Sequence, residues 1–167
     1  GMDKATSGEI IVAKKDITKY NKKQLIKYRR TNIGFVFQFY NLIQNLTALE
    51  NVELATEICK NSLSPRETLI NVGLKDRLNN FPAQLSGGEQ QRTSIGRALI
   101  SRPAIVLADE PTGNLDTKAS EEIVSLLKKS NKEMKQTIIM ITHNLELAKV
   151  ADKIIEIADG RIVGEEK

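Results

Sequence analysis

The sequence contains ten glycines, and none of them is followed by lysine. A glycine-rich loop ending in Gly-Lys-Ser or Gly-Lys-Thr, which cradles nucleotide phosphates, is therefore absent from these 167 residues. The single cysteine, Cys59, excludes an internal disulfide, and its apolar surroundings favour a buried thiol in a reducing compartment. Tryptophan is absent, and four phenylalanines and three tyrosines provide no evident stacking platform for nucleic acid.

Long hydrophobic runs and a strong charge imbalance are also missing. The net charge is +4, from 25 basic and 21 acidic residues that are interspersed along the chain. A basic cluster at 22–30 is the exception, and we interpret it as a solvated face and not as a nucleic-acid surface. Because no apolar run is long enough to span a bilayer, we expect a cytoplasmic protein that meets a membrane only through a partner.

With 40% apolar residues, the chain is long enough for one domain with its own core. The apolar pattern predicts strands at 9–13, 33–37, 105–108, 138–141, 153–157 and 161–163. Capping signals at Thr47 and at Ser64, which precedes Pro65, predict two helices in the middle of the chain. The continuous apolar runs 105–108 and 138–141 predict a parallel sheet buried on both faces, so the fold class is doubly wound α/β with a helical insert.

Two adjacent carboxylates, Asp109 and Glu110, follow a buried parallel strand. Open α/β sheets bind their ligands at this end of the strands. One carboxylate can hold Mg²⁺ through water, and the other can orient or deprotonate an attacking water. Taken alone, the pair is explained equally well as two solvated acids at the end of a strand.

The segment Leu85–Arg92, Leu-Ser-Gly-Gly-Glu-Gln-Gln-Arg, also has two explanations. Ser86 and Glu89 have the spacing of a capping box, with Gly87 and Gly88 as loop residues. Alternatively, the helix start offers its free N–H groups and the Ser86 hydroxyl to an anion, and the two glycines let a phosphate approach the backbone. We favour the anion site, although the helix dipole contributes only about 0.3–1 kcal/mol and other donors are needed.

Together these motifs resemble those of the ABC transporter ATPases, and the resemblance covers essentially the whole chain. Its implied fold is a P-loop NTPase fold whose parallel sheet lacks the Walker A strand and which carries an inserted helical subdomain. The implied parts are a remnant of the α/β core up to the Q-loop at 1–40, the helical signature subdomain at 41–101, and the α/β core with Walker B, D-loop and switch histidine at 102–167. The resemblance implies catalysis for Glu110, His143 and Gln38, and Mg²⁺ binding for Asp109 and Gln38. It implies a D-loop role for Asp116. In a dimer, the residues implied to contact nucleotide held by the other subunit are Ser86, Gly87, Gly88 and Gln90.

The stretches 37–42 and 46–52 are similar to those of the lipoprotein-release and macrolide-export branch of the family. This resemblance implies ATP and Mg²⁺ as cofactors. It also implies a transmembrane permease subunit as partner, with 39–46 as candidate contacts. Neither the transported substrate nor the direction of transport follows from the residues.

The chain departs from the family's pattern at its start, because residues 2–9 resemble the stretch that follows the Walker A helix. We therefore expect an N-terminally truncated ABC ATPase that by itself binds ATP weakly and hydrolyses it very poorly. A missing sheet strand would expose unpaired strand edges, so we also expect a homodimer, with strand exchange as one route to it. An alternative function is a nucleotide-free interaction module that docks on a permease or on an intact ABC ATPase. A chromosome-maintenance ATPase ranks last, because the interval 38–85 has no sustained heptads.

Overall fold

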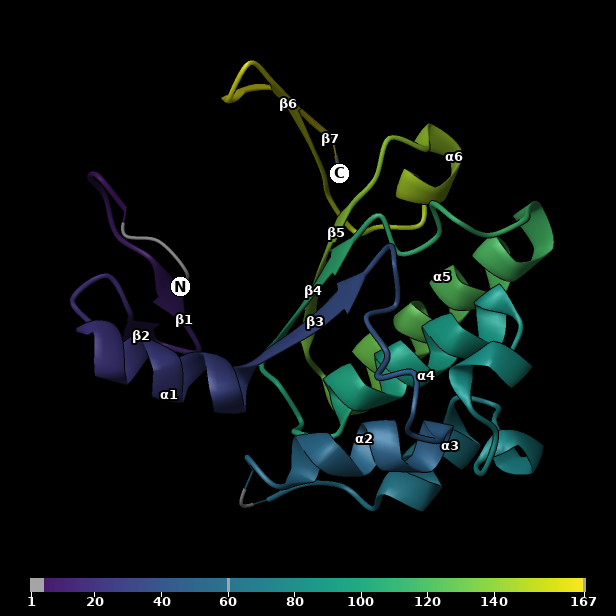
Figure 1. Cartoon of the computed structure of the whole chain (residues 1–167). Coiled ribbons are helices and arrows are strands. Elements are labelled where there is room, and N and C mark those ends of the chain that lie inside the picture. Colours follow the sequence, from purple (N-terminus) through teal and green to yellow (C-terminus); the bar gives the residue numbers. More distant parts are fainter. Residues whose placement is uncertain (1–4, 60, 167) are drawn as a thin grey trace.

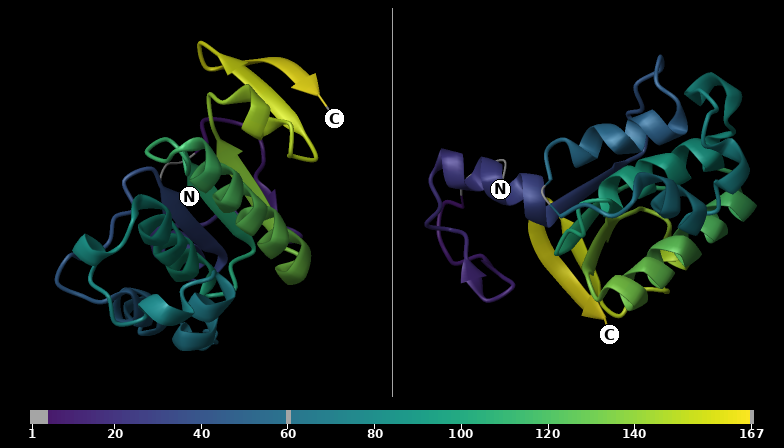
Figure 2. Two further views of the ribbon diagram at one scale, coloured as in Figure 1. Left: turned by 90° about the vertical axis from the view of Figure 1, so that its right-hand side faces the viewer. Right: turned by 90° about the horizontal axis from the view of Figure 1, so that it is seen from below.

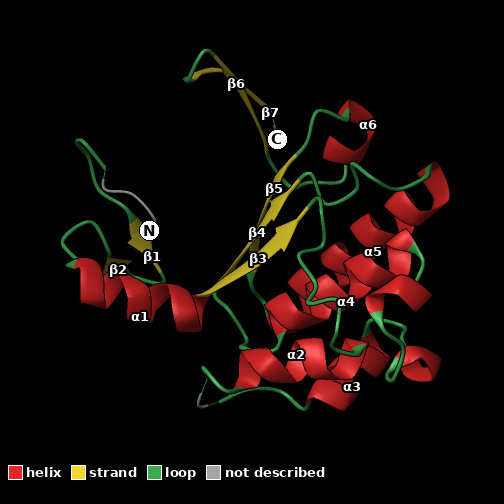
Figure 3. Ribbon diagram, viewed as in Figure 1, coloured by secondary structure: helices red, strands yellow, loops and turns green. Residues whose placement is uncertain are grey.

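The computed structural model of the chain describes residues 5–59 and 61–166. Its strands are β1 (Ile11–Val12), β2 (Lys15–Asp16), β3 (Ile33–Phe37), β4 (Ile105–Asp109), β5 (Thr137–Ile141), β6 (Ile154–Ala158) and β7 (Arg161–Glu166). Its helices are α1 (Lys22–Asn32), α2 (Ala48–Thr56), α3 (Pro65–Asn71), α4 (Gly87–Leu99), α5 (Thr117–Met134) and α6 (Leu145–Ala148), with 3-10 turns η1 (Lys75–Arg77) and η2 (Pro82–Gln84). Figures 1 and 3 show the helices grouped mainly beside a small central sheet.

The central sheet has three parallel strands in the order β3-β4-β5. The register aligns Phe37 with Asp109 and Asp109 with Ile141, so the three strands end at the same level. Because the strands are parallel, the residues that follow them lie at one edge of the sheet. The predicted parallel sheet is confirmed, and the strands predicted at 33–37, 105–108 and 138–141 are each found within one residue of their predicted ends.

One face of this sheet carries the core. Val36 and Val106 are fully buried there, together with Ile95 of α4 and Ile123 of α5. Helix α4 lies so close to β3 that a Cβ on Gly34 would stand 2.6 Å from the carbonyl oxygen of Ala98. Glycine at position 34 therefore lets the helix that begins with the signature segment pack directly on the strand that leads to Gln38.

The other face of the sheet differs from the prediction. We expected 138–141 to be buried on both faces, but Ile139 and Ile141 are 48% and 60% exposed. Side chains alternate across a strand, and only the face that carries Ile138 and Met140 packs against the core. In the described part of the chain, helices α2 to α5 lie on that one side of the sheet (Figure 1).

The helix start signals are confirmed. Thr47 caps α2 in a complete capping box with Glu50, and Ser64 caps α3 ahead of Pro65. Asn51 is buried within α2, and its amide donates to the carbonyls of Ile43, Leu46 and Thr47. This side chain therefore folds the loop that connects β3 to the helical insert.

The two hairpins lie apart from the central sheet. β1 pairs only with β2 and β6 only with β7 among the described strands, both antiparallel. Figure 2 shows α1 with the first hairpin extending away from the other helices, and the last hairpin extending from the body near α6. The predicted strand at 9–13 is shorter than expected, and residues 2–4 of the stretch 2–9 lie outside the described residues.

Cys59 also differs from the prediction of a buried thiol. Helix α2 ends at Thr56, before Cys59, and the cysteine is only partly buried. Its thiol donates to the carbonyl of Arg30 at 3.3 Å.

Candidate active site

Glu110 and His143 meet where β4 and β5 end. The Glu110 N–H donates to the carbonyl of Ile141, which anchors the residue after β4 to the last residue of β5. The Glu110 carboxylate then accepts from the His143 backbone N–H at 3.1 Å, and the His143 Nδ1 lies 2.7 Å from the same oxygen. Glu110 has a left-handed φ of 45°, a conformation found in tight or functional sites.

The two partners are exposed to different degrees. The His143 side chain is 85% exposed, while that of Glu110 is 22% exposed. A carboxylate only accepts hydrogen bonds, so in this arrangement Nδ1 carries the proton and Nε2 is left for another partner. The site therefore presents a carboxylate held in place by the chain and an imidazole that can reach a ligand from solvent.

Gln38 follows β3 at the same edge of the sheet. Its Nε2 donates to Asn114 Oδ1 at 3.2 Å, and the Asn114 amide donates back to the Gln38 carbonyl at 3.1 Å. A Cβ on Gly113 would lie 2.7 Å from Gln38 Nε2, so the glutamine packs directly on the turn 113–114. The structure thus brings Gln38 against the turn that precedes Asp116, to which the resemblance assigns a D-loop role.

Asp109 ends β4 with an exposed side chain. A hard oxygen donor at the end of a parallel strand suits Mg²⁺, which binds through one or two carboxylates and keeps several waters. Within residues 5–59 and 61–166, no group of three or more His, Cys, Asp or Glu could hold a metal ion. The side-chain amide of Gln38 is engaged with Asn114, so its pairing with Asp109 at a magnesium ion stays a prediction.

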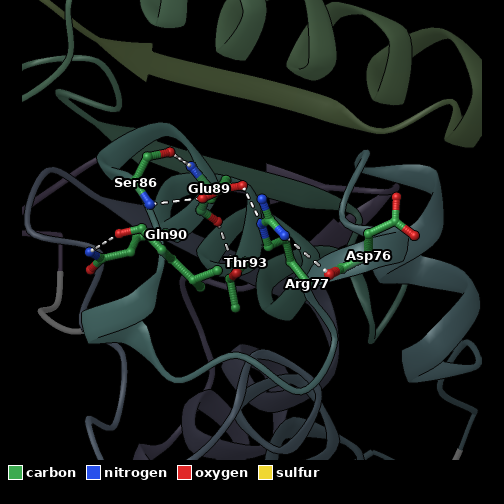
Figure 4. A network of polar contacts seen from close by, with 7 residues as sticks. Asp76, Arg77, Ser86, Glu89, Gln90 and Thr93 are labelled. Atoms are coloured by element: carbon green, nitrogen blue, oxygen red, sulfur yellow. Dashed lines mark hydrogen bonds and ion pairs between the residues drawn. The ribbon is translucent and has the colours of Figure 1, made fainter.

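The signature segment forms the start of α4, with Ser86 as its N-cap (Figure 4). The Ser86 hydroxyl accepts from the Glu89 N–H, and the Glu89 carboxylate accepts from the Ser86 N–H at 2.8 Å. Arg77 of η1 donates to the other carboxylate oxygen of Glu89 at 2.9 Å. The capping box that was one of the two explanations for this segment is therefore present.

A capping role leaves anion binding open at the same residues. In the cap the Ser86 hydroxyl only accepts, so its own proton can still be donated. The first N–H groups of a helix have no partner within the helix, and the hydrogen bonds of the described residues leave those of Gly87 and Gly88 unused. Gln90 is different, because its side chain donates to the carbonyl of Leu85.

The two glycines of the segment have different surroundings. A Cβ on Gly87 would lie 2.8 Å from the hydroxyl of Tyr40 and 3.2 Å from Leu115 Cδ2. A Cβ on Gly88 would meet only the Cβ of Ala119, at an ordinary 3.5 Å. Packing within the chain thus explains glycine at 87 but gives no reason for glycine at 88.

Asp116 is the N-cap of α5, where its carboxylate accepts from the Ala119 N–H at 2.8 Å. The predicted D-loop residue therefore has a structural role in addition to the one that its motif implies. It fixes the start of the helix that follows the turn 113–114.

Sequence reasoning missed Gln91, which joins three of these segments. Gln91 is fully buried on α4 and donates to the carbonyls of Pro111, at 2.6 Å, and Phe37, at 3.3 Å. It thus connects the signature helix with the ends of β3 and β4. The signal in the sequence was a glutamine on the apolar side of a helix, where a polar group needs a partner.

The chain belongs to the ABC transporter family. The profile of that family, described as ABC transporter, matches residues 1–113. This match agrees with a parallel sheet whose strand ends hold Gln38, Asp109 and Glu110, and with a capped signature helix beside them. The resemblance to ABC transporter ATP-binding subunits is confirmed.

Named relatives cover nearly the whole chain. It is 46% identical to an uncharacterized ABC transporter ATP-binding protein of Thermotoga maritima over 171 residues, which cover 99% of this chain and 73% of that protein. It is 44% identical to the lipoprotein-releasing system ATP-binding protein LolD of Syntrophotalea carbinolica, over 98% of this chain and 74% of that protein.

Among solved structures, the chain is similar to the ATP-binding cassette MJ0796 in a dimeric post-hydrolysis state bound to ADP and Pi. The TM-score is 0.84 at 42% identity, and the match covers 99% of this chain and 75% of that one. The similarity confirms the predicted α/β cassette fold. None of the helices in residues 5–59 and 61–166 has the length and apolar character needed to cross a membrane.

Proposed function

We propose that this chain acts in an ATP-binding subunit that couples ATP hydrolysis to transport across a membrane. The observation that carries the proposal is the pair of Glu110 and His143, joined at 2.7 Å beside Gln38 at the ends of the parallel strands. A carboxylate fixed by two contacts from one neighbouring residue suits the orientation and deprotonation of a water. The branch resemblance and the lipoprotein-releasing relatives favour a role in that kind of system.

The residues at the strand ends would have separate roles in ATP hydrolysis. Glu110 would take the proton of the attacking water, and His143, as an imidazolium that donates from both ring nitrogens, would donate its Nε2–H to the terminal phosphate. Asp109 would hold Mg²⁺ through water, and Gln38 would reach the same region once its amide leaves Asn114. Bound Mg²⁺ supplies charge compensation for the phosphates.

The signature residues would serve nucleotide on a second subunit. Ser86 offers a hydroxyl proton, Gly87 and Gly88 offer N–H groups at a helix start, and Gln90 lies on the next turn. Dimeric cassettes among the similar structures support a paired arrangement. The division of the chain at 1–40, 41–101 and 102–167 belongs to the same proposal.

We infer that residues 1–167 bind ATP weakly by themselves. They contain no Gly-Lys-Ser or Gly-Lys-Thr loop, so a triphosphate would lack most of the N–H groups and the lysine charge that compensate it. The second candidate, an interaction module without nucleotide, is favoured by this same observation. Substantial ATP binding by the chain alone would exclude this second candidate.

Two kinds of protein partner fit the surface. A groove of about 500 Å³ lies between α1, β3, α2 and α4, lined by apolar residues such as Phe37 and Ile58 and by Arg97. Together with the 73% exposed Phe39, it supports docking of a cytoplasmic segment of a permease. Among the described strands, β5 lies at the edge of the central sheet, which supports a homodimer with strand exchange as one route to it. Light scattering would show the dimer as a mass of twice the chain.

The test of the function is complementation in trans. The chain is mixed with an intact cassette of the lipoprotein-releasing type, and the ATPase rate of that cassette is measured. We expect the rate to change and a Ser86→Ala variant to give a smaller change, whereas no change and no complex would contradict the proposal. In a longer version that carries a Gly-Lys-Ser loop, Glu110→Gln should reduce turnover by about 100-fold or more and accumulate ATP-bound dimer.

A further inference from the structure

The short loop after β3 has an unusual backbone. Tyr40 and Asn41 both have left-handed φ values, 57° and 51°, and neither is glycine. Side chains with a Cβ disfavour this region, and two such residues in succession need something that holds them. The loop carries Gln38 at its start, so what holds it also affects the candidate site.

Arg97 of α4 holds these two residues. Its Nη1 donates to the carbonyl of Asn41 at 2.6 Å and its Nη2 to the carbonyl of Tyr40 at 2.9 Å. The planar guanidinium fork suits two neighbouring acceptors. Burial lowers the pKa of Arg97, and among the described residues it forms no ion pair with a carboxylate. The partly buried guanidinium of Arg97 thus donates to two backbone carbonyls and not to a carboxylate.

The side chain of Tyr40 extends the contact to the signature segment. Its hydroxyl stands so close to Gly87 that a Cβ there would lie 2.8 Å from it. The backbone of Tyr40 is therefore fixed by the last turns of α4, while its ring reaches the first residue of the same helix. Gly87 and the 38–41 loop cannot move independently while this contact lasts.

Arg97 also lines the groove between α1, β3, α2 and α4. A segment bound in that groove would lie against Arg97, whose guanidinium holds the carbonyls of Tyr40 and Asn41. Packing alone is the simpler explanation of Arg97, but packing does not require a charged fork directed at two left-handed residues.

We propose that Arg97 is a positioning residue that links this groove to the signature segment, because its guanidinium fixes Tyr40 and Tyr40 fixes the surroundings of Gly87. The functional role of this link rests on the proposed function, because the link connects the docking groove to the residues that would meet nucleotide in trans. The contacts themselves are independent of nucleotide.

The test is NMR of the uniformly ¹⁵N-labelled chain without nucleotide, comparing Arg97→Gln, Arg97→Lys and the parent. Ring currents from Tyr40 make the Gly87 amide shift a direct reporter of their contact. We expect Arg97→Gln to displace the Gly87 signal and to speed amide exchange at Tyr40 by about ten-fold, as loss of bonds from a charged donor implies. Arg97→Lys, which keeps one donor, should give a smaller displacement.

Arg92→Gln is the matched control, because it removes an arginine of the same helix that pairs instead with Glu122 of α5 at 2.6 Å. It should leave the Gly87 signal in place. An unchanged Gly87 signal in Arg97→Gln, or an equal displacement in Arg92→Gln, would overturn the proposal.

If Arg97→Gln does not fold, Tyr40→Leu provides the decision. It removes the aromatic ring beside Gly87 and with it the ring current, so the Gly87 signal should move, and an unmoved signal would again overturn the proposal. No nucleotide is present in either experiment. A negative result therefore leaves the proposed function standing, and a negative result in trans complementation leaves this contact standing.

Discussion

Alanine at Gly88 and alanine at Gly87 should have opposite effects on stability. A Cβ at Gly88 meets only Ala119 Cβ at 3.5 Å, which is ordinary contact, whereas at Gly87 it stands 2.8 Å from the Tyr40 hydroxyl and 3.2 Å from Leu115. Replacing glycine by alanine within a helix gains about 0.5–1 kcal/mol. Overpacking costs about 1–3 kcal/mol.

The expected free energy of unfolding therefore rises by about 0.5–1 kcal/mol for Gly88→Ala and falls by about 1–2 kcal/mol for Gly87→Ala. For a chain of this length, 1 kcal/mol corresponds to a Tm shift of about 2–4 °C. Thermal unfolding followed by circular dichroism measures both variants against the parent. A lower Tm for Gly88→Ala, or an equal rise for both variants, would refute the packing argument.

The same pair separates folding from function. If glycine at 88 serves the approach of a phosphate, Gly88→Ala should fold well and yet lose its effect on an intact cassette in trans. A folded Gly88→Ala variant with the full effect would show that the glycine is not needed there.

Gln91→Leu should lower the free energy of unfolding by about 1–3 kcal/mol in urea, because the buried carbonyl of Pro111 loses its donor, while Gln44→Leu on the exposed loop should change it little. Partial burial alone would raise the pKa of Glu89, but hydrogen bonds from Ser86 and Arg77 outweigh it and lower that pKa from its ordinary 4.5. A lowered carboxyl pKa stabilises the fold above the ordinary value, and the effect is lost as the pH falls through the lowered pKa. The Tm difference between the parent and Glu89→Gln should therefore be present at about pH 7 and vanish in acid below the lowered pKa. A Tm difference that persists in acid would contradict the role given to the carboxylate.

The local signals in the sequence predicted the central strands and the helix starts. The run Ile33–Phe37 is a strand with those bounds, and the capping pairs at Thr47 and Ser86 form as their spacing predicts. These are local effects, set by side-chain alternation and by the first unpaired N–H groups of a helix.

The contacts between distant segments could not be predicted from local sequence patterns. The bonds of Gln91 to Pro111 and of Arg97 to Tyr40 join residues 20 and 57 positions apart, and no periodicity encodes them. The exposure of Ile141 was missed for a related reason, since an apolar run reports that a strand can be buried and not which segments cover it.

For the motif residues, the sequence predicted part of the arrangement and the structure adds the rest. The resemblance named Glu110 and His143 separately, and the geometry adds that the backbone N–H and the Nδ1 of His143 both contact one oxygen of the Glu110 carboxylate. It also named Gln38 and Asp116, and the geometry adds the reciprocal amide bonds of Gln38 with Asn114. The sequence predicted the site residues, and the contacts show how these side chains are held.

The affinity of this chain alone for Mg²⁺-ATP, measured by isothermal titration calorimetry, tests the central claim most directly. Residues 1–167 are proposed to carry the groups that activate water and meet a partner subunit, without the loop that grips the phosphates. We therefore expect no saturation up to about 1 mM ATP, because most of the compensating donors are absent. A micromolar dissociation constant with one ATP bound per chain would contradict the claim.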